Sequence, residues 1–271
     1  MSGRRAARVI FGRELASIVR TRSYLLLFVG VSAVILGIAT VGGGTGAGYV
    51  PTAVDLLLPL ELLVPAVAFA VGYRSIADDV QRDELSVLST YPVPDWAYVG
   101  GVYAGRAVTV VGILGIPLLV VGILVSLSAG PDTTIVATHR GIDSPVLFGR
   151  FVLLTLAYGL MVLAVVLALS ALASSRKAAL TLAVVGLGGL VVGLDLLVLR
   201  GVGTGWVTGD TLLTAIAASP TSAYRGLVFE TVLYVAFEAE TGYASPVASA
   251  FSLLAWTLIG LSITALGVSR R

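Results

Sequence analysis

The chain has 271 residues, of which 57% are hydrophobic and only 12% are charged, and its formal net charge is +2. This composition excludes an ordinary soluble domain and is typical of a polytopic membrane protein. So small a net charge gives no support for nucleic acid as a partner. The sequence contains no cysteine, which excludes disulfides and metal sites built on thiolates.

The sequence offers no local motif for catalysis or nucleotide binding. Lys177, the one lysine, follows Arg176 without a preceding glycine-rich loop, so no G-x-x-x-x-G-K-[ST] loop is present. His139 stands beside Arg140 in a polar loop, and no G-x-S-x-G elbow accompanies it. We therefore expect that this chain is not an enzyme and binds no cofactor or metal. An ATP-driven activity would require a partner that holds ATP and magnesium.

The N-terminal segment before the first apolar run is basic and amphipathic. It is too long and too charged for a cleaved signal peptide. Phe11, Leu15, Ile18 and Val19 recur at helical spacing, whereas Arg13 falls on the opposite side. This pattern predicts an interfacial helix in the headgroup layer that leads into the first span. The alternative is a plain positive flank that sets topology.

Six apolar runs are long enough to cross the hydrocarbon core, which is about 30 Å thick. The predicted fold is therefore an all-α membrane protein with six transmembrane helices in a single domain. The predicted spans are at about 24–41, 54–73, 107–126, 151–172, 178–199 and 247–268.

Three acidic residues fall inside or at the ends of predicted spans. Asp55 and Glu61 are expected near the outer end of the second span, and Asp195 lies in the fifth. Ionisable groups in a membrane are costly without a partner or water, so Glu61 and Asp195 are candidates for a transport path. The alternative for Asp195 is a contact with Arg200 that caps the outer end of the span.

The stretch 200–245 is the longest one without a predicted span. Its segment 227–240 is apolar but contains Glu230, Glu238 and Glu240, which make a full crossing costly. We predict an interfacial or re-entrant helix there.

The stretch 74–106 is a charged interruption between the second and third spans. Its acids and apolar residues alternate at helical spacing until Pro92 and Pro94, which end a helix. This pattern predicts an amphipathic helix at the membrane surface or against another protein. The alternative is a solvated face that keeps the loop out of the bilayer. The residues concerned are Ile76, Asp78, Asp79, Val80, Arg82, Asp83, Glu84, Val87 and Leu88.

The distribution of basic residues predicts the topology, because Lys and Arg gather on the cytoplasmic side. With both termini in the cytoplasm, 13 of the 17 Lys and Arg residues lie inside. The stretch 74–106 is then cytoplasmic, and the protein is a multi-pass protein of the cell membrane.

The stretch after the second span contains a patterned set of residues, Leu85, Val87, Leu88, Ser89, Tyr91, Pro92, Val93, Trp96, Val99, Gly101 and Gly105. In these residues the chain resembles the membrane subunit of ABC-2-type exporters. Within that family it is similar to permeases associated with copper-site maturation of nitrous oxide reductase. Asp83, Asp95 and Val102 depart from the family pattern. A second matching element is Ser219-Pro220 with Tyr224-Arg225.

The resemblance implies a division of labour between chains. Two permease copies, or one copy and a related permease chain, would pair with two cytoplasmic ATP-binding cassette ATPase subunits. The charged helix would dock on the ATPase as a coupling helix and switch the spans between two states. The implied coupling residues are Asp78, Asp79, Val80, Arg82, Asp83, Glu84, Leu85, Leu88 and Pro92.

Two other classes of function are open from the sequence. An ATP-independent secondary transporter predicts paired ionisable residues near the bilayer midplane, and a membrane scaffold predicts no transport path. An intramembrane hydrolase predicts a nucleophile and a base within the spans, and the sequence offers no such pair.

Overall fold

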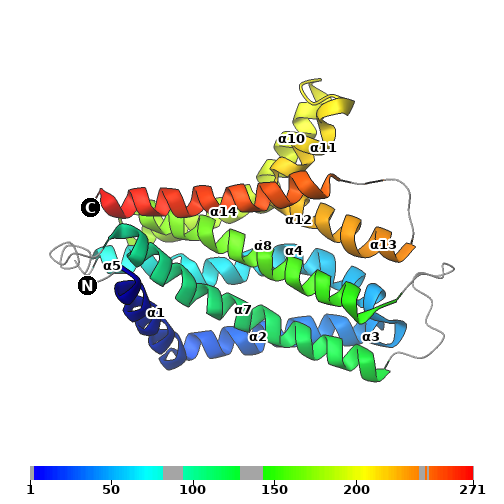
Figure 1. Ribbon diagram of the computed structural model, residues 1–271, viewed down its shortest axis with the longest axis horizontal. Helices are drawn as coiled ribbons and strands as arrows, with labels where there is room; N and C mark the ends of the chain where they lie inside the picture. The colour runs from blue at the N-terminus through cyan, green and yellow to red at the C-terminus, as the bar shows by residue number, and fades with distance from the viewer. Residues whose placement is uncertain (1–2, 82–93, 129–142, 238–241, 243, 271) are drawn as a thin grey trace.

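The computed structural model describes residues 3–81, 94–128, 143–237, 242 and 244–270, and these ranges are almost wholly helical. The long helices lie side by side along one axis, and both chain termini lie at the same end of the bundle (Figure 1). We call this end the terminal end and the opposite one the far end. The described residues contain no strand.

Six helical segments of the described chain are long and apolar enough to cross a membrane, which confirms the predicted all-α membrane fold. They are α2 (Arg22–Val41), α4 (Tyr49–Gly72) continued by α5 (Ser75–Gln81), α7 (Asp95–Ser128), α8 (Pro145–Leu172), α9 (Arg176–Gly188) continued by α10 (Leu194–Gly203), and α14 (Pro246–Ser269).

Several of these helices begin earlier than the apolar runs predict, because polar groups cap them beyond the apolar part. Helix α4 begins at Tyr49, not near residue 54, after the short helix α3 (Gly44–Ala47). The carboxylate of Asp143 accepts hydrogen bonds from the backbone N–H groups of Tyr49 and Val50, at 2.9 and 2.8 Å. Helix α8 begins after Ser144, whose side chain accepts from Val146 N.

Helix α8 lies at the centre of the bundle and packs against α4, α7 and α14. Its side chains Phe151, Tyr158 and Leu167 are fully buried. The contact with α14 is a close approach of helix backbones, since a Cβ atom on Gly260 would lie only 2.7 Å from the carbonyl carbon of Ala164. Small residues favour such helix pairs in membranes, where apolar surfaces gain little by leaving lipid.

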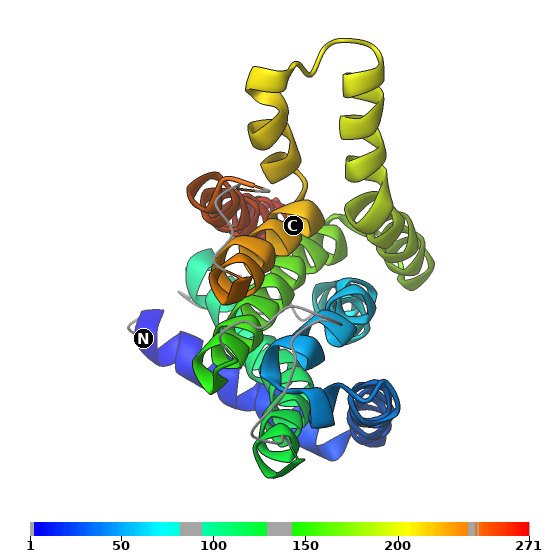
Figure 2. The same cartoon turned by 90° about the vertical axis from the view of Figure 1, so that its right-hand side faces the viewer.

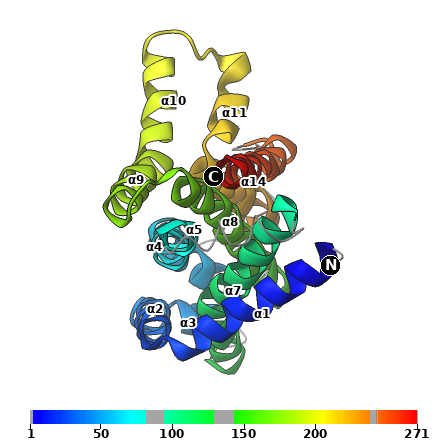
Figure 3. The ribbon, with the colours of Figure 1, turned by 90° about the vertical axis from the view of Figure 1, so that its left-hand side faces the viewer.

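The fifth crossing is bent, and no bend was predicted for the span 178–199. Helix α9 ends in the π-helical segment Gly189–Gly193, after which α10 turns away from the bundle axis. A turn joins α10 to α11 (Gly209–Ala218), and the two helices form a hairpin that projects from the side of the bundle (Figures 2 and 3). A π-helical turn is a common cause of such a bend.

The stretch 220–237 forms one continuous helical run, which overlaps the segment 227–240 where an interfacial or re-entrant helix is predicted. It comprises α12 (Pro220–Val228), a π-helical segment (Phe229–Leu233) and α13 (Tyr234–Phe237). Every residue of α12 except Arg225 is buried, and the helix packs between α8 and α14. The run extends towards the far end (Figure 1). Glu238 and Glu240 lie outside the described residues.

Helix α1 (Gly3–Arg20) crosses α7 at the terminal end (Figure 1). It is amphipathic as predicted, but its buried stripe is Ala6, Ile10 and Glu14. The predicted apolar residues Phe11, Leu15 and Ile18 are only partly buried. The stripe with Glu14 is the buried one because it packs closely against a glycine face on α7. A Cβ atom on Gly105 would lie 2.5 Å from Glu14 Cβ.

Candidate functional site

The predicted coupling segment is partly within the described residues. Asp78, Asp79 and Val80 lie in α5, at the terminal end beside α1 and α8. Val80 is half-buried and packs against the main core. The other predicted coupling residues, Arg82, Asp83, Glu84, Leu85, Leu88 and Pro92, lie outside the described residues.

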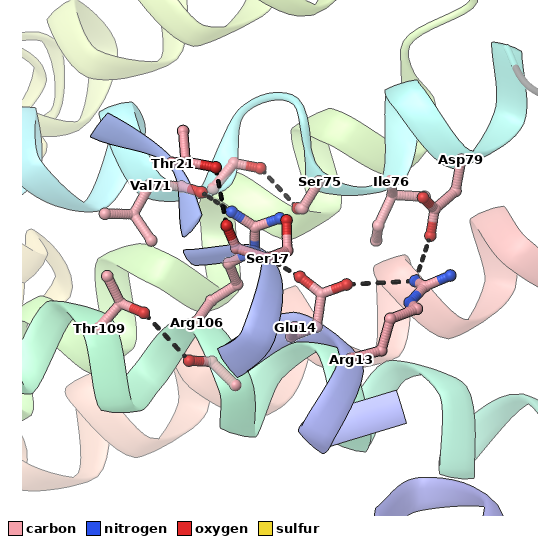
Figure 4. Close-up of polar contacts among 12 residues, drawn as sticks. Arg13, Glu14, Ser17, Thr21, Val71, Ser75, Ile76, Asp79, Arg106 and Thr109 are labelled. Carbon is pink, nitrogen blue, oxygen red and sulfur yellow. Dashed lines mark hydrogen bonds and ion pairs between the residues drawn. The ribbon is translucent and has the colours of Figure 1, made fainter. Parts of the chain in front are cut away.

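Asp79 faces Arg13 of α1 (Figure 4), and its contacts join three helices. It is 9% exposed, and its Oδ2 accepts hydrogen bonds from Arg13 Nη2 at 2.9 Å and from the Tyr98 hydroxyl at 2.7 Å. These partners belong to α1 and α7, respectively. A nearly buried carboxylate that accepts two hydrogen bonds from within the chain is committed to internal contacts, so Asp79 offers a docking partner little surface.

Arg13 and Glu14 extend this contact along α1. Arg13 Nη2 also donates to Glu14 Oε1 at 3.1 Å, and Glu14 is 5% exposed. Burial by itself would lower the pKa of Arg13, but the attraction and hydrogen bond of Asp79, aided by Glu14, raise that pKa above its ordinary value. The network therefore holds a permanent positive charge between two carboxylates.

Arg106 of α7 closes the network on its other side (Figure 4). Its Nε lies 2.8 Å from Glu14 Oε2 as an ion pair, although the two atoms are not aligned as a hydrogen bond. Its Nη1 donates to the Val71 carbonyl at 3.1 Å and to the Tyr24 hydroxyl. One arginine thus ties α1, α2 and α4 to α7.

The opposite side of α5 is fixed to α8 and α9. Asp78 Oδ1 accepts from Arg176 Nε at 2.9 Å, and Arg74 Nε lies 3.6 Å from its Oδ2. The Ser170 hydroxyl of α8 accepts from the backbone N–H groups of Ile76 and Ala77, at 3.2 and 3.1 Å. Helix α5 is therefore held at once by α1, α7, α8 and α9.

Sequence reasoning missed four members of this network, Glu14, Tyr98, Arg106 and Ser170. One signal was available: Glu14 is the single acidic residue of the basic N-terminal segment. It stands at i+4 from Ile10 and i+8 from Ala6, on one helical stripe. The other three carry no local signal, because their roles depend on helices distant in sequence.

A second polar cluster lies within the membrane-spanning part. Arg225 of α12 forms a bidentate pair with Glu61 of α4, with Nε to Oε1 at 2.6 Å and Nη2 to Oε2 at 2.5 Å. The place of Glu61 near the outer end of its span stays a prediction, and in the structure Glu61 falls about halfway along the 24 residues of α4. The side chain of Glu61 is only 7% exposed. A charged pair at this depth is costly to bury unless it is well hydrogen-bonded, as it is here.

Asp195 belongs to the same cluster. Its Oδ1 accepts from the Ser222 hydroxyl at 2.9 Å, which links the start of α10 to α12. The Tyr158 and Tyr224 rings stack at 4.7 Å, with their planes 5° apart. The sequence singled out Glu61 and Asp195 separately, and the fold brings both of them to α12.

The Tyr158 and Tyr224 hydroxyls are hydrogen-bonded to Thr221 and Thr155. Helix α12 is thus joined by polar contacts to α4, α8 and α10.

No protein-family model and no curated protein sequence matches this chain.

Proposed function

We propose that this chain is the permease subunit of an ABC-2-type exporter in the cell membrane. A separate ATPase subunit would bind ATP and magnesium, and a second permease copy or a related chain would complete the path. The observation that carries the proposal is the attachment of α5 to four helices, directly before the acidic stretch 82–93.

A coupling element needs a rigid connection to the parts that it moves. Helix α5 meets this need because its acids, its first-turn amides and its core side chains are all bound by neighbouring helices. A push on the stretch that follows α5 would therefore reach α1, α7, α8 and α9 together. Packed helices have discrete arrangements, so such a push favours switching between two states.

The proposal gives the predicted coupling residues two roles. Asp79 is an internal link, since Arg13 and Tyr98 cover it. Docking on an ATPase is assigned to the charges of the following stretch, Asp83 and Glu84, with Asp78 at its margin. Reversal of the charge on Asp79 would break the internal network and would not report on docking.

The test is co-purification of the tagged chain from mildly solubilised membranes. We expect a P-loop ATPase to accompany the native chain and to be lost from an Asp83→Arg/Glu84→Arg variant. An Asp210→Arg variant is the matched control, because Asp210 is an exposed acid on α11, outside the α5 network. Absence of any ATPase from the native preparation would refute the proposal.

An ATP-independent transporter is the second candidate, and the Glu61–Arg225 pair favours it. A buried ion pair halfway along a span is the kind of group that secondary transporters use to couple ions to a substrate. The test is a pH gradient imposed on liposomes that contain the chain alone. Proton flux that Glu61→Gln abolishes would support this candidate over the exporter.

A further inference from the structure

An apolar groove of about 660 Å³ lies at the far end between α7 and α8, beside the start of α4. Phe148 and Val152 form its floor and are 4% and 6% exposed. Leu119, Ile123 and Leu153 form its walls and are largely exposed. The two floor side chains are thus buried, and the three wall side chains are exposed.

Two glycines leave this space open. Gly122 lies against Phe148, whose ring would be 3.2 Å from a Cβ atom at that position. Gly149 faces open space, since a Cβ atom there would meet nothing within 4 Å. A larger side chain at position 149 would therefore fill the groove without disturbing the packing around it.

The groove opens where hydrocarbon surrounds the protein. Both of its helices are membrane-spanning, and the groove occupies their far-end portions. In a bilayer an open apolar groove is in contact with acyl chains and not with water. Tyr49 lines the groove at the start of α4, in the position that aromatic residues favour at a membrane interface.

Arg150 lines the groove and can form further hydrogen bonds. It is exposed and lies five residues after the start of α8, roughly 8 Å along the helix. Its Nη1 donates to the Thr231 carbonyl at 3.2 Å. Among the described residues, no carboxylate forms an ion pair with it. A guanidinium carries five N–H donors, and its planar fork suits a phosphate.

We propose that the groove binds one phospholipid of the far-end leaflet, with the phosphate on Arg150 and an acyl chain running deeper along Val152 and Leu119. An amphiphile with one anionic end matches a long apolar groove with a single cation at its edge. The inference goes beyond the proposed function, because it requires only that the six helices span a bilayer.

The test is native mass spectrometry of the delipidated protein titrated with phosphatidylglycerol. We expect one lipid to bind to the native chain. Gly149→Leu fills the groove and should abolish binding, and Arg150→Gln should weaken it about tenfold through loss of the charge-assisted bond. Gly112→Leu is the matched control, since Gly112 also faces open space but lies on α7 outside the groove.

Several outcomes would overturn the proposal. Unchanged binding by Gly149→Leu would remove the groove from consideration. Equal binding of uncharged diacylglycerol, or no effect of Arg150→Gln, would refute the role of the phosphate. A chain dimer that Gly149→Leu dissociates would assign the groove to a second copy instead. If Gly149→Leu fails to fold, the headgroup comparison and Arg150→Gln decide between these outcomes.

Discussion

Arg13 and Asp79 are 66 positions apart in the sequence, and Arg13 Nη2 donates a hydrogen bond of 2.9 Å to Asp79 Oδ2. This bond joins the N-terminal helix to the helix that precedes the acidic stretch. The N-terminal helix is therefore part of the mechanical unit around α5, in addition to any role as a membrane anchor. Any motion of α5 must carry α1 with it or break this contact.

The first prediction concerns the strength of that contact. Arg13→Gln and Asp79→Asn should each lower the free energy of unfolding by about 1–3 kcal/mol, because each removes one charge from a charge-assisted hydrogen bond. Their double variant should show a coupling energy of about 0.5–3 kcal/mol. Denaturant unfolding in detergent measures this cycle. Arg8→Gln, an exposed arginine of the same helix, is the control and should have little effect. Strict additivity of the two changes would contradict the contact.

The second prediction concerns the glycine face on α7. Gly105→Ala should destabilise the protein by about 1–3 kcal/mol, because its methyl group would overlap Glu14 and force α1 away. Gly100→Ala is a matched control on the same helix, where a Cβ atom meets nothing within 4 Å. It should be neutral or slightly stabilising, since alanine favours a helix. Limited proteolysis of the N-terminal segment should report release of α1 in the first variant only.

The third prediction concerns the ion pair within the membrane. Glu61→Leu should lower the free energy of unfolding by about 1–3 kcal/mol, because it removes the charged acceptor of two hydrogen bonds from Arg225. Glu61→Leu/Arg225→Met should recover much of this loss, since two apolar side chains replace the pair. Thermal unfolding in detergent distinguishes the variants. A double variant as unstable as the single one would show that the cost arises from lost packing and not from charge.

The fourth prediction concerns the start of α4. Asp143→Ala should destabilise the far end by about 1–2 kcal/mol, because the backbone N–H groups of Tyr49 and Val50 lose their acceptor. Asp143→Asn keeps one acceptor oxygen and should cost less. Hydrogen exchange at Tyr49 and Val50 measures the effect locally. Equal protection in the native chain and in Asp143→Ala would contradict the capping role.

The sequence predicted the membrane class and the six apolar helices, because burial in lipid requires long runs of apolar residues whatever their neighbours. It also predicted amphipathic character for the N-terminal helix. The transport role of Glu61 and Asp195 stays a prediction. The helix boundaries were predicted less accurately than the helices themselves, since caps such as Asp143 reach α4 from a distant part of the chain. The bend of the fifth crossing was not predicted either, because a π-helical turn has no clear signature in composition.

Tertiary structure alone decided which charges meet. Asp78 and Asp79 are neighbours in an acidic run, yet one faces Arg176 and the other Arg13, because successive helical residues point in different directions. Glu61 and Arg225 are 164 positions apart and meet only because α12 re-enters the bundle beside α4. Charge and hydropathy set the cost of placing a group in the membrane. Which partner offsets this cost depends on how helices that are far apart in the sequence pack together.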